Sequence, residues 1–248
     1  MSDKLRGKRV VIVGGSSGIG FGVAKLALTA GASVIISSSN QTKVDAAVKR
    51  LVDLDVGGPV EGKVLDVKGG ESAVKAFFEA LPEFNHLIWT AGDFFPLNYP
   101  NGDLTGVQDT FVVRTLGPIY AGKYAPSRMP KSSDSSIILT CGSVSRKPSK
   151  GMAIGAAVSG ATERFAKGLA VELAPIRVNA VSPGAVQTEL WDALPAESVQ
   201  ALLSTLTQKL LVQHVADADE AAEPYLYLMR SAYVTGEVVN VDGGAVLA

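Results

Sequence analysis

The sequence is poor in three features, each of which would point to a particular class of protein. It has one cysteine, Cys141, which excludes a disulfide framework or a cysteine-rich zinc site within the chain. Its 23 Lys and Arg residues nearly balance its 24 Asp and Glu residues, so no general field attracts nucleic acid or anionic lipid. No apolar run reaches the ~18 residues that a membrane span needs. We therefore expect neither a nucleic-acid partner nor a membrane.

The start of the chain and its composition narrow the class further. Residues 1–6 have neither an apolar core nor a cleavage site, so no secretory signal is predicted. The 248 residues are 47% apolar and 19% charged, which suits one large core and is unlike a disordered chain. We expect a cytoplasmic protein with no bound metal, folded as one domain over residues 1–248.

The chain alternates short apolar runs with helical segments. Strands are predicted at 10–13, 33–36, 62–65, 86–89, 136–139, 177–181 and 237–241, and helices at 21–30, 43–52, 71–80, 111–124 and 153–173. Apolar strands separated by helices predict a parallel sheet covered on both faces. With right-handed crossovers this is a doubly wound, seven-stranded, Rossmann-like α/β fold. Such folds bind ligands at the carboxyl ends of their strands.

A glycine-rich turn follows the first predicted strand and precedes a helix. Its glycines allow a tight turn and a close approach to a diphosphate, and the helix N-terminus offers free N–H groups to phosphate oxygens. The strand–turn–helix context favours a nucleotide site over a purely structural turn, which is the alternative. The predicted diphosphate contacts are Gly14, Ser16, Ser17, Gly18, Ile19 and Gly20.

The residues after the second predicted strand indicate whether the site binds NAD(H) or NADP(H). An acid there would bind the ribose 2′-hydroxyl and repel a 2′-phosphate. Residues 37–43 (SSSNQTK) offer hydroxyls, an amide and a lysine, with no acid before Asp45. We therefore predict NADP(H) rather than NAD(H), bound in part by Ser37, Ser38, Ser39 and Asn40. The alternative is that these residues only cap the next helix.

Five segments, in order, resemble the single-domain short-chain dehydrogenase/reductases over nearly the whole chain. Residues 13–20 are similar to the family's T-G-x-x-x-G-I-G, and 89–92 (WTAG) stand at its N-N-A-G. Residues 66–67 match its adenine site, 177–188 its R-V-N-x-x-x-P-G-x-x-x-T, and 233–244 its C-terminal strand. The resemblance implies a nicotinamide-dependent oxidoreductase whose further cofactor contacts are Asp66, Val67, Thr90, Ala91, Gly92, Pro183, Gly184, Val186 and Thr188.

The sequence departs from the family at the residues that carry its chemistry. Members use a serine and a Y-x-x-x-K pair, in which the lysine lowers the pKa of the tyrosine that passes a proton. Ser143 matches the serine, but Gly155 and Ser159 stand at the tyrosine and lysine positions. No tyrosine of this chain has a lysine four residues later. Arg114 replaces an assisting asparagine, so the resemblance leaves Ser143 and Arg114 as catalytic candidates.

Both candidates also have a structural explanation. Ser143 could orient a substrate heteroatom or simply cap a turn at the end of a strand. Arg114 could bind a substrate carbonyl, stand in for the lysine near the ribose, or form a salt bridge at a subunit contact. Fungal reductase/Diels–Alderases of indole alkaloid pathways are similar in lacking the pair and carrying this arginine. Their proposed catalytic acid falls near residues 148–151, where this chain has none.

A missing tyrosine favours a reaction that needs no proton. Reduction of a carbonyl makes an alkoxide, and losing the general acid costs such a reaction roughly 10²–10⁴-fold. An iminium is already cationic and accepts hydride directly, so positioning next to the nicotinamide can supply most of the catalysis. The sequence thus predicts an NADP(H)-dependent reductase of an imine, iminium or similar activated compound in secondary metabolism. The alternatives are a cofactor-binding isomerase or cyclase, and a catalytically inactive nucleotide-binding protein.

A segment at about 188–212 follows the nicotinamide motif and is predicted to form a lid. It carries Trp191 and several leucines, which suggest a hydrophobic small-molecule substrate; two amphipathic helices packed on the core are the alternative. The small residues of 153–173, and the resemblance, predict helix pairing in a homodimer or homotetramer.

Four other residues could take part in chemistry but also have structural explanations. We expect Cys141 to be a buried strand cysteine and His86 a structural histidine. His214 has no partner at metal-ligand spacing, and Asp93 is either a turn residue or faces the pocket.

Overall fold

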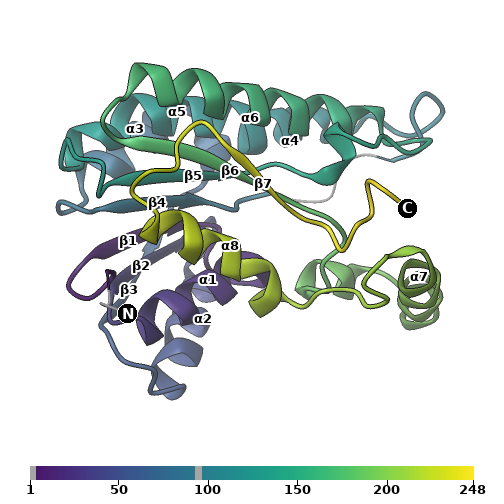
Figure 1. Ribbon diagram of the computed structural model, residues 1–248, viewed down its shortest axis with the longest axis horizontal. Helices are drawn as coiled ribbons and strands as arrows, with labels where there is room; N and C mark the ends of the chain where they lie inside the picture. The colour runs from purple at the N-terminus through teal and green to yellow at the C-terminus, as the bar shows by residue number, and fades with distance from the viewer. Residues whose placement is uncertain (1–3, 93–96) are drawn as a thin grey trace.

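Seven parallel strands form the centre of the protein, seen here in a computed structural model that describes residues 4–92 and 97–248 (Figure 1). The strand order is β3-β2-β1-β4-β5-β6-β7. The strands are β1 (Arg9–Val13), β2 (Ser33–Ser38), β3 (Val60–Val64), β4 (His86–Trp89), β5 (Ser136–Thr140), β6 (Arg177–Pro183) and β7 (Val238–Val241). The predicted doubly wound, seven-stranded parallel sheet is confirmed.

Helices cover both faces of the sheet, as Figure 1 shows. On one side lie α1 (Gly18–Thr29), α2 (Gln41–Asp53) and α8 (Ala218–Arg230), and on the other α3 (Gly70–Glu79), α4 (Val107–Phe111), α5 (Gly117–Tyr124) and α6 (Ala153–Glu172). Alternate strand residues enter the two layers: Val11 and Val13 join one core cluster, and Val10 and Ile12 the other. Two apolar cores therefore hold the sheet between them.

The structure corrects several predicted boundaries. Helix α8 was missed, because Pro224 inside it interrupts the helical pattern. The predicted helix 111–124 begins earlier, at Val107, and contains a π-helical turn over Val112–Leu116. The third strand begins at Val60 and ends at Val64, before Asp66. The segment predicted at about 188–212 begins with a short 3₁₀ helix, η5 (Glu189–Ala193), and only its later part is an α-helix.

Strand order reverses at β1, which pairs with β2 on one side and β4 on the other. The turns after β1 and β4 therefore diverge to opposite faces of the sheet and leave a ligand crevice between them. Helix α7 (Ala196–Lys209) lies outside the two layers, to the side of the sheet in Figure 1. Across the described ranges, no helix combines the length and the apolar character that crossing a bilayer requires.

Candidate cofactor and active site

The turn after β1 packs its backbone directly against the end of β4. Gly14 has φ +90°, and a Cβ placed on it would lie 2.5 Å from the backbone nitrogen of Ala91. A Cβ on Gly20 would strike the carbonyl oxygen of Gly14 and lie 2.5 Å from Oγ1 of Thr90. The Thr90 hydroxyl bonds back to this turn, 3.1 Å from the Gly14 oxygen. Only glycine fits at 14 and 20, and the result is a bare main-chain cradle.

Helix α1 begins at this cradle, and its N-cap side chain does not satisfy the N–H groups of the first turn. Its N-cap residue, Ser17, is extended and exposed, and its side chain makes no capping hydrogen bond. The first-turn N–H groups of a helix have no partner within the helix. The cradle therefore fits a dinucleotide diphosphate: it offers N–H donors, a hydroxyl and backbone without Cβ atoms.

A carboxylate from a distant part of the chain also reaches this helix end. Oε2 of Glu189 accepts a hydrogen bond of 2.8 Å from the Gly18 N–H, and Oε1 lies 3.4 Å from Arg50 Nη1. The Arg50 guanidinium stacks on the Phe21 ring, 4.0 Å from its centroid. Burial opposes the charge of Glu189, but its own backbone N–H, that of Gly18, and Arg50 outweigh burial and lower the pKa. Glu189 thus takes one of the donors that a diphosphate would use.

The serines after β2 do not act alike. Ser37, predicted to bind the cofactor, is fully buried in β2, and its hydroxyl has no hydrogen-bond partner among the described residues. Its carbonyl instead accepts from the N–H groups of Gly14 and Gly15, at 3.0 and 3.1 Å. Ser38 is half-buried, and Ser39 and Asn40 are exposed. The Asn40 side chain caps α2 by accepting from the Lys43 N–H at 3.1 Å, which is the alternative considered above.

The other predicted cofactor residues line the same edge of the sheet. Asp66 is exposed and caps a 3₁₀ turn by accepting from the Lys68 N–H at 3.0 Å, while Val67 is buried beside it. After β6, a Cβ on Gly184 would lie 2.9 Å from Cα of Asp242, so the chain turns tightly there. Val186 then pairs with Ala216, and the Thr188 side chain packs over Gly18. The predicted residues that follow β1, β4 and β6 thus meet at one edge of the sheet, where Pro183 ends β6 and Ile19 lies in the first turn of α1.

Arg114 points into this edge of the sheet from the π-helical turn. A Cβ placed on Gly92 would collide with the Arg114 guanidinium, so the head group lies against the end of β4. Its carbonyl accepts a 2.9 Å hydrogen bond from Thr162 on α6. A π-helical turn displaces a residue from the regular helix path, and such turns occur often at functional sites. Asp93 lies outside the described residues.

Ser143 begins a 3₁₀ turn, η4 (Ser143–Ser145), directly after β5. Its carbonyl accepts from the N–H groups of Arg146 and Lys147, both at 3.0 Å. Facing this turn is α6, where Gly155 and Ser159 are buried. A Cβ on Gly142 would lie 3.2 Å from the Ser159 hydroxyl oxygen. The helix face at the family's tyrosine and lysine positions therefore adjoins the Ser143 turn.

The remaining titratable candidates have structural roles. Cys141 is 6% exposed, and burial raises its thiol pKa to about 11, so the prediction of a buried strand cysteine is confirmed. His86 is buried against Ser136, 2.9 Å from its hydroxyl, and burial lowers its pKa to about 3, which confirms a structural histidine. His214 lies 3.0 Å from Glu220, whose carboxylate raises the imidazole pKa.

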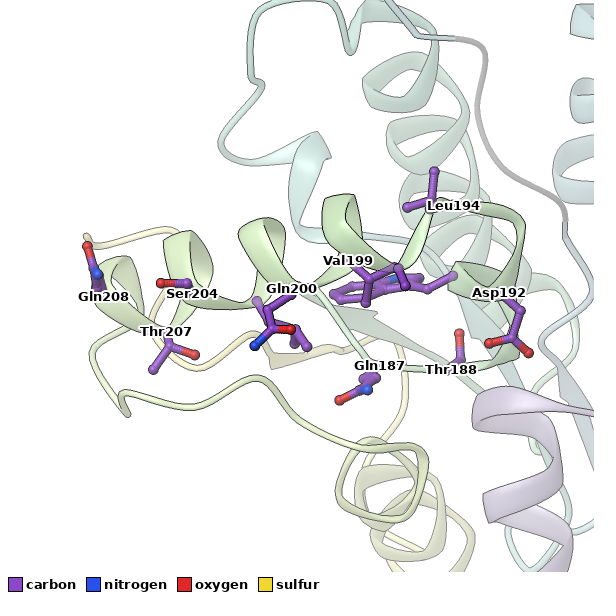
Figure 2. Close-up of a pocket in the computed structure, with 12 residues that line it drawn as sticks. Gln187, Thr188, Asp192, Leu194, Val199, Gln200, Ser204, Thr207 and Gln208 are labelled. Carbon is purple, nitrogen blue, oxygen red and sulfur yellow. The ribbon is translucent and has the colours of Figure 1, made fainter.

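A pocket of about 770 Å³ lies between the η5 segment and α7. Figure 2 shows Thr188 and Asp192 near one end of it and Thr207 and Gln208 at the other. Its lining mixes apolar side chains with hydroxyls and amides, including Trp191, Leu194, Val199, Leu203, Gln187, Gln200 and Ser204. The pocket therefore adjoins the Thr188 end of the crevice.

The whole sequence, residues 1–248, matches the SDR-like Rossmann domain. The chain belongs to the short-chain dehydrogenase/reductase family. It is 38% identical over 264 residues to the short-chain dehydrogenase/reductase ucsE of an Acremonium species, covering 100% of this chain and 98% of that protein. Members of this family are NAD(P)-dependent oxidoreductases by type.

Solved structures resemble this chain over its whole length. MalC reductase/Diels–Alderase from Malbranchea aurantiaca superposes with a TM-score of 0.92 at 32% identity, covering 99% of both chains. A small-chain dehydrogenase in complex with NADPH superposes with a TM-score of 0.81 at 31% identity, covering 98% of this chain and 100% of that one. The family resemblance read from the sequence motifs is confirmed.

Sequence reasoning missed three residues that the fold brings to the site. Glu189 and Arg50 meet at the start of α1 although 139 positions separate them in sequence. Glu163 is buried on α6 and accepts from the Ser145 hydroxyl at 3.0 Å. The capping box of Asp217 and Glu220, by contrast, was a sequence signal that could have revealed α8.

Proposed function

We propose that this protein is an NADP(H)-dependent reductase of an activated C=N bond, an imine or iminium, in a hydrophobic small molecule of secondary metabolism. One observation carries the proposal: the main-chain cofactor cradle is complete, while the face of α6 beside Ser143 holds Gly155 and Ser159. A protein with that combination can place a nicotinamide but has no phenol–ammonium pair at this face to protonate an alkoxide.

Reduction of an iminium suits a site that contains Ser143 and Arg114 but no tyrosine–lysine pair at this face of α6. When bound in the cradle, a reduced nicotinamide would supply hydride for a new C–H bond at the iminium carbon, and the C=N π pair would become the lone pair on nitrogen. No proton transfer is needed in that step, so positioning carries most of the catalysis. Ser143, at the start of its turn, orients the substrate heteroatom, and the Arg114 guanidinium borders the site at Gly92.

Three observations support the choice of cofactor and substrate class. Ser38 ends β2, and Ser39 and Lys43 follow it with no acid before Asp45, which favours a 2′-phosphate. The NADPH complex of a relative with a TM-score of 0.81 supports the same choice. The 770 Å³ pocket beside Thr188, with its mixed lining, is of the size that holds drug-sized ligands.

The decisive experiment separates binding from turnover. Thermal unfolding is followed with NADPH, NADH or neither; a ligand at 100 times its Kd adds about 2.7 kcal/mol of stability. NADPH oxidation is then measured with matched iminium and ketone substrates. We expect a larger shift with NADPH, turnover of the iminium only, and strong losses in Arg114→Ala and Ser143→Ala. A larger shift with NADH, or equal turnover of the ketone, would contradict the proposal.

A second function is favoured by one comparison. The MalC structure is named a reductase and a Diels–Alderase, which supports a cyclase-like role in which the same pocket shapes a reactive intermediate. Cyclisation without net NADPH consumption would identify that role. Tight NADPH binding without any conversion would instead indicate an inactive nucleotide-binding protein.

We further propose that the protein acts in the cytoplasm as a homodimer or homotetramer paired through α5 and α6. A Cβ on Gly160 or Gly168 of α6 would meet nothing within 4 Å, so this face is open in the single chain. Light scattering gives the mass of the assembly, and a monomer would contradict the pairing.

A further inference from the structure

Glu163 is the one buried carboxylate within residues 4–92 and 97–248, at 7% exposure. Its Oε2 accepts a 3.0 Å hydrogen bond from the Ser145 hydroxyl. Its Oε1 lies 3.9 Å from the guanidinium of Arg164, whose side chain is 77% exposed. A buried charge is unfavourable unless it is well paired, and a solvent-exposed cation at that distance compensates little. The position of Glu163 therefore leaves negative charge in the protein that the described side chains only partly balance.

The carboxylate lies along the helix face that adjoins the candidate active site. Gly155, Ser159 and Glu163 follow one another at intervals of four on α6 and are all buried, so they share one face. The Ser159 hydroxyl, 1% exposed, has no hydrogen-bond partner among the described residues, and it faces Gly142. Glu163 is tied through Ser145 to the turn that begins at Ser143. One stripe thus presents a small residue, an unpaired hydroxyl and an anion.

The field of this carboxylate reaches the end of β5. Burial is the main cause of the raised pKa of Cys141, and the charge of Glu163 adds to it, while the Ser182 hydroxyl, the Gly142 backbone N–H and the charge of Arg146 oppose it. The other cation near the site, Arg114, lies against Gly92 at the end of β4. The buried carboxylate of Glu163 thus lies on the Ser143 side of the site, and the Arg114 guanidinium lies on the Gly92 side.

We propose that Glu163 determines specificity by making the Ser143 side of the site select a cationic substrate, an iminium, over a neutral carbonyl of the same shape. The inference rests on the proposed function and narrows its substrate class. Where the family resemblance expects a lysine, one helical turn before Glu163, this chain has Ser159. The stripe therefore carries a negative charge and no positive one. The total charge facing Glu163 is the same before and after hydride addition, so its effect falls on substrate binding.

The test compares two probes of similar size, the cation 2-methyl-3,4-dihydroisoquinolinium and the neutral ketone 1-tetralone. Binding is measured by calorimetry with NADP⁺ present, so no hydride is transferred. Glu163→Gln keeps the size and the acceptor for Ser145 but removes the charge. We expect it to weaken binding of the cation about tenfold, the order expected when one charge is removed from a partly screened site, and to leave binding of the ketone within about twofold.

Matched variants separate charge from structure. Glu163→Asp keeps the charge and should retain the preference for the cation, as should Ser145→Ala, which loses only the hydrogen bond. Glu172→Gln makes the same change at an exposed position of the same helix and should alter neither affinity. In turnover assays, Glu163→Gln should raise KM for the iminium while kcat stays within about twofold.

Two results would overturn the inference: equal loss of both probes in Glu163→Gln, or a wild-type protein that binds the cation no better than the ketone. A failure of the proposed function looks different. In that case the cation still binds selectively and Glu163→Gln still removes the selectivity, but NADPH is not consumed with the iminium.

Discussion

Replacing Glu189 should make the protein bind its cofactor more tightly. The carboxylate occupies the N–H of Gly18, at the helix end where a diphosphate is expected, and it also repels the anion that would replace it. A charge-assisted hydrogen bond contributes about 1.5–3 kcal/mol to stability. The Glu189 side chain is 42% exposed, and its ion pair with Arg50 is worth at most about 1 kcal/mol in such a setting.

These terms set the size of the effect. Because Glu189 is partly exposed, we take the lower end of this range and reduce it to about 1 kcal/mol for breaking its hydrogen bond to Gly18. The cofactor must supply that free energy when it binds, which makes its apparent Kd roughly fivefold weaker. Glu189→Gln retains the shape of the side chain and a weaker, neutral acceptor. We therefore expect it to bind NADPH about fivefold more tightly than the wild-type protein at low salt. The gain should shrink as salt screens the charges.

Two measurements test the prediction: the affinity for NADPH and the movement of the η5 turn. Calorimetry gives the Kd for NADPH, and the fluorescence of Trp191, 9% exposed and in the same η5 turn as Glu189, reports whether the turn moves. Glu197→Gln, an exposed acid in the first turn of α7, is the matched control and should change neither signal. If Glu189→Gln bound NADPH no more tightly than the control, the carboxylate would not compete with the diphosphate and the reasoning would be refuted.

Three further predictions concern the glycine cradle, the N-cap of α2 and the buried histidine. Gly20→Ala should abolish the NADPH-induced thermal shift, because its Cβ would collide with the Gly14 carbonyl; a retained shift would contradict the cradle. Asn40→Ala should lower the unfolding free energy by about 1 kcal/mol in urea titrations, as a lost N-cap does, with NADPH affinity unchanged if Asn40 only caps α2. Because His86 has its pKa lowered to about 3 by burial while the unfolded chain takes up a proton near 6.5, stability should fall by about 2 kcal/mol from pH 7 to 5. His86→Asn should remove that component of the pH dependence; an unchanged urea profile would show that other groups cause it.

The fold was predictable because its signals are local. Runs such as Val10–Val13 are apolar on both sides, and a glycine turn follows directly, so strand, turn and helix can be read in order. The errors lie where a local signal conflicts with tertiary structure. Pro224 obscured α8, although the Asp217 cap was present, and the π-helical turn around Arg114 follows no sequence periodicity.

The candidate site was predictable only in its main-chain half. Gly14 and Gly20 are where a bare backbone is needed, and glycines are visible in a sequence. Glu163 is not visible in the same way, because a glutamate on a helix is nearly always exposed and its burial depends on distant packing. Glu189 stays exposed, but its contacts with Gly18 and Arg50 join residues far apart in the sequence. The burial of the Ser37 side chain is hidden for a related reason, because strand alternation decides which face of the sheet a residue enters.

This division explains how the chemistry of such a protein can change while its cofactor stays. The diphosphate cradle consists of N–H groups and carbonyls held by close backbone contacts, so it persists as long as the glycines do. The proposed reacting side of the site depends instead on which residues stand along one stripe of α6, at 155, 159 and 163. These three positions lie on a different element from the glycines of the cradle. A stripe with tyrosine and lysine serves proton transfer to an alkoxide, whereas a stripe ending in a buried carboxylate favours a substrate that arrives with its own positive charge.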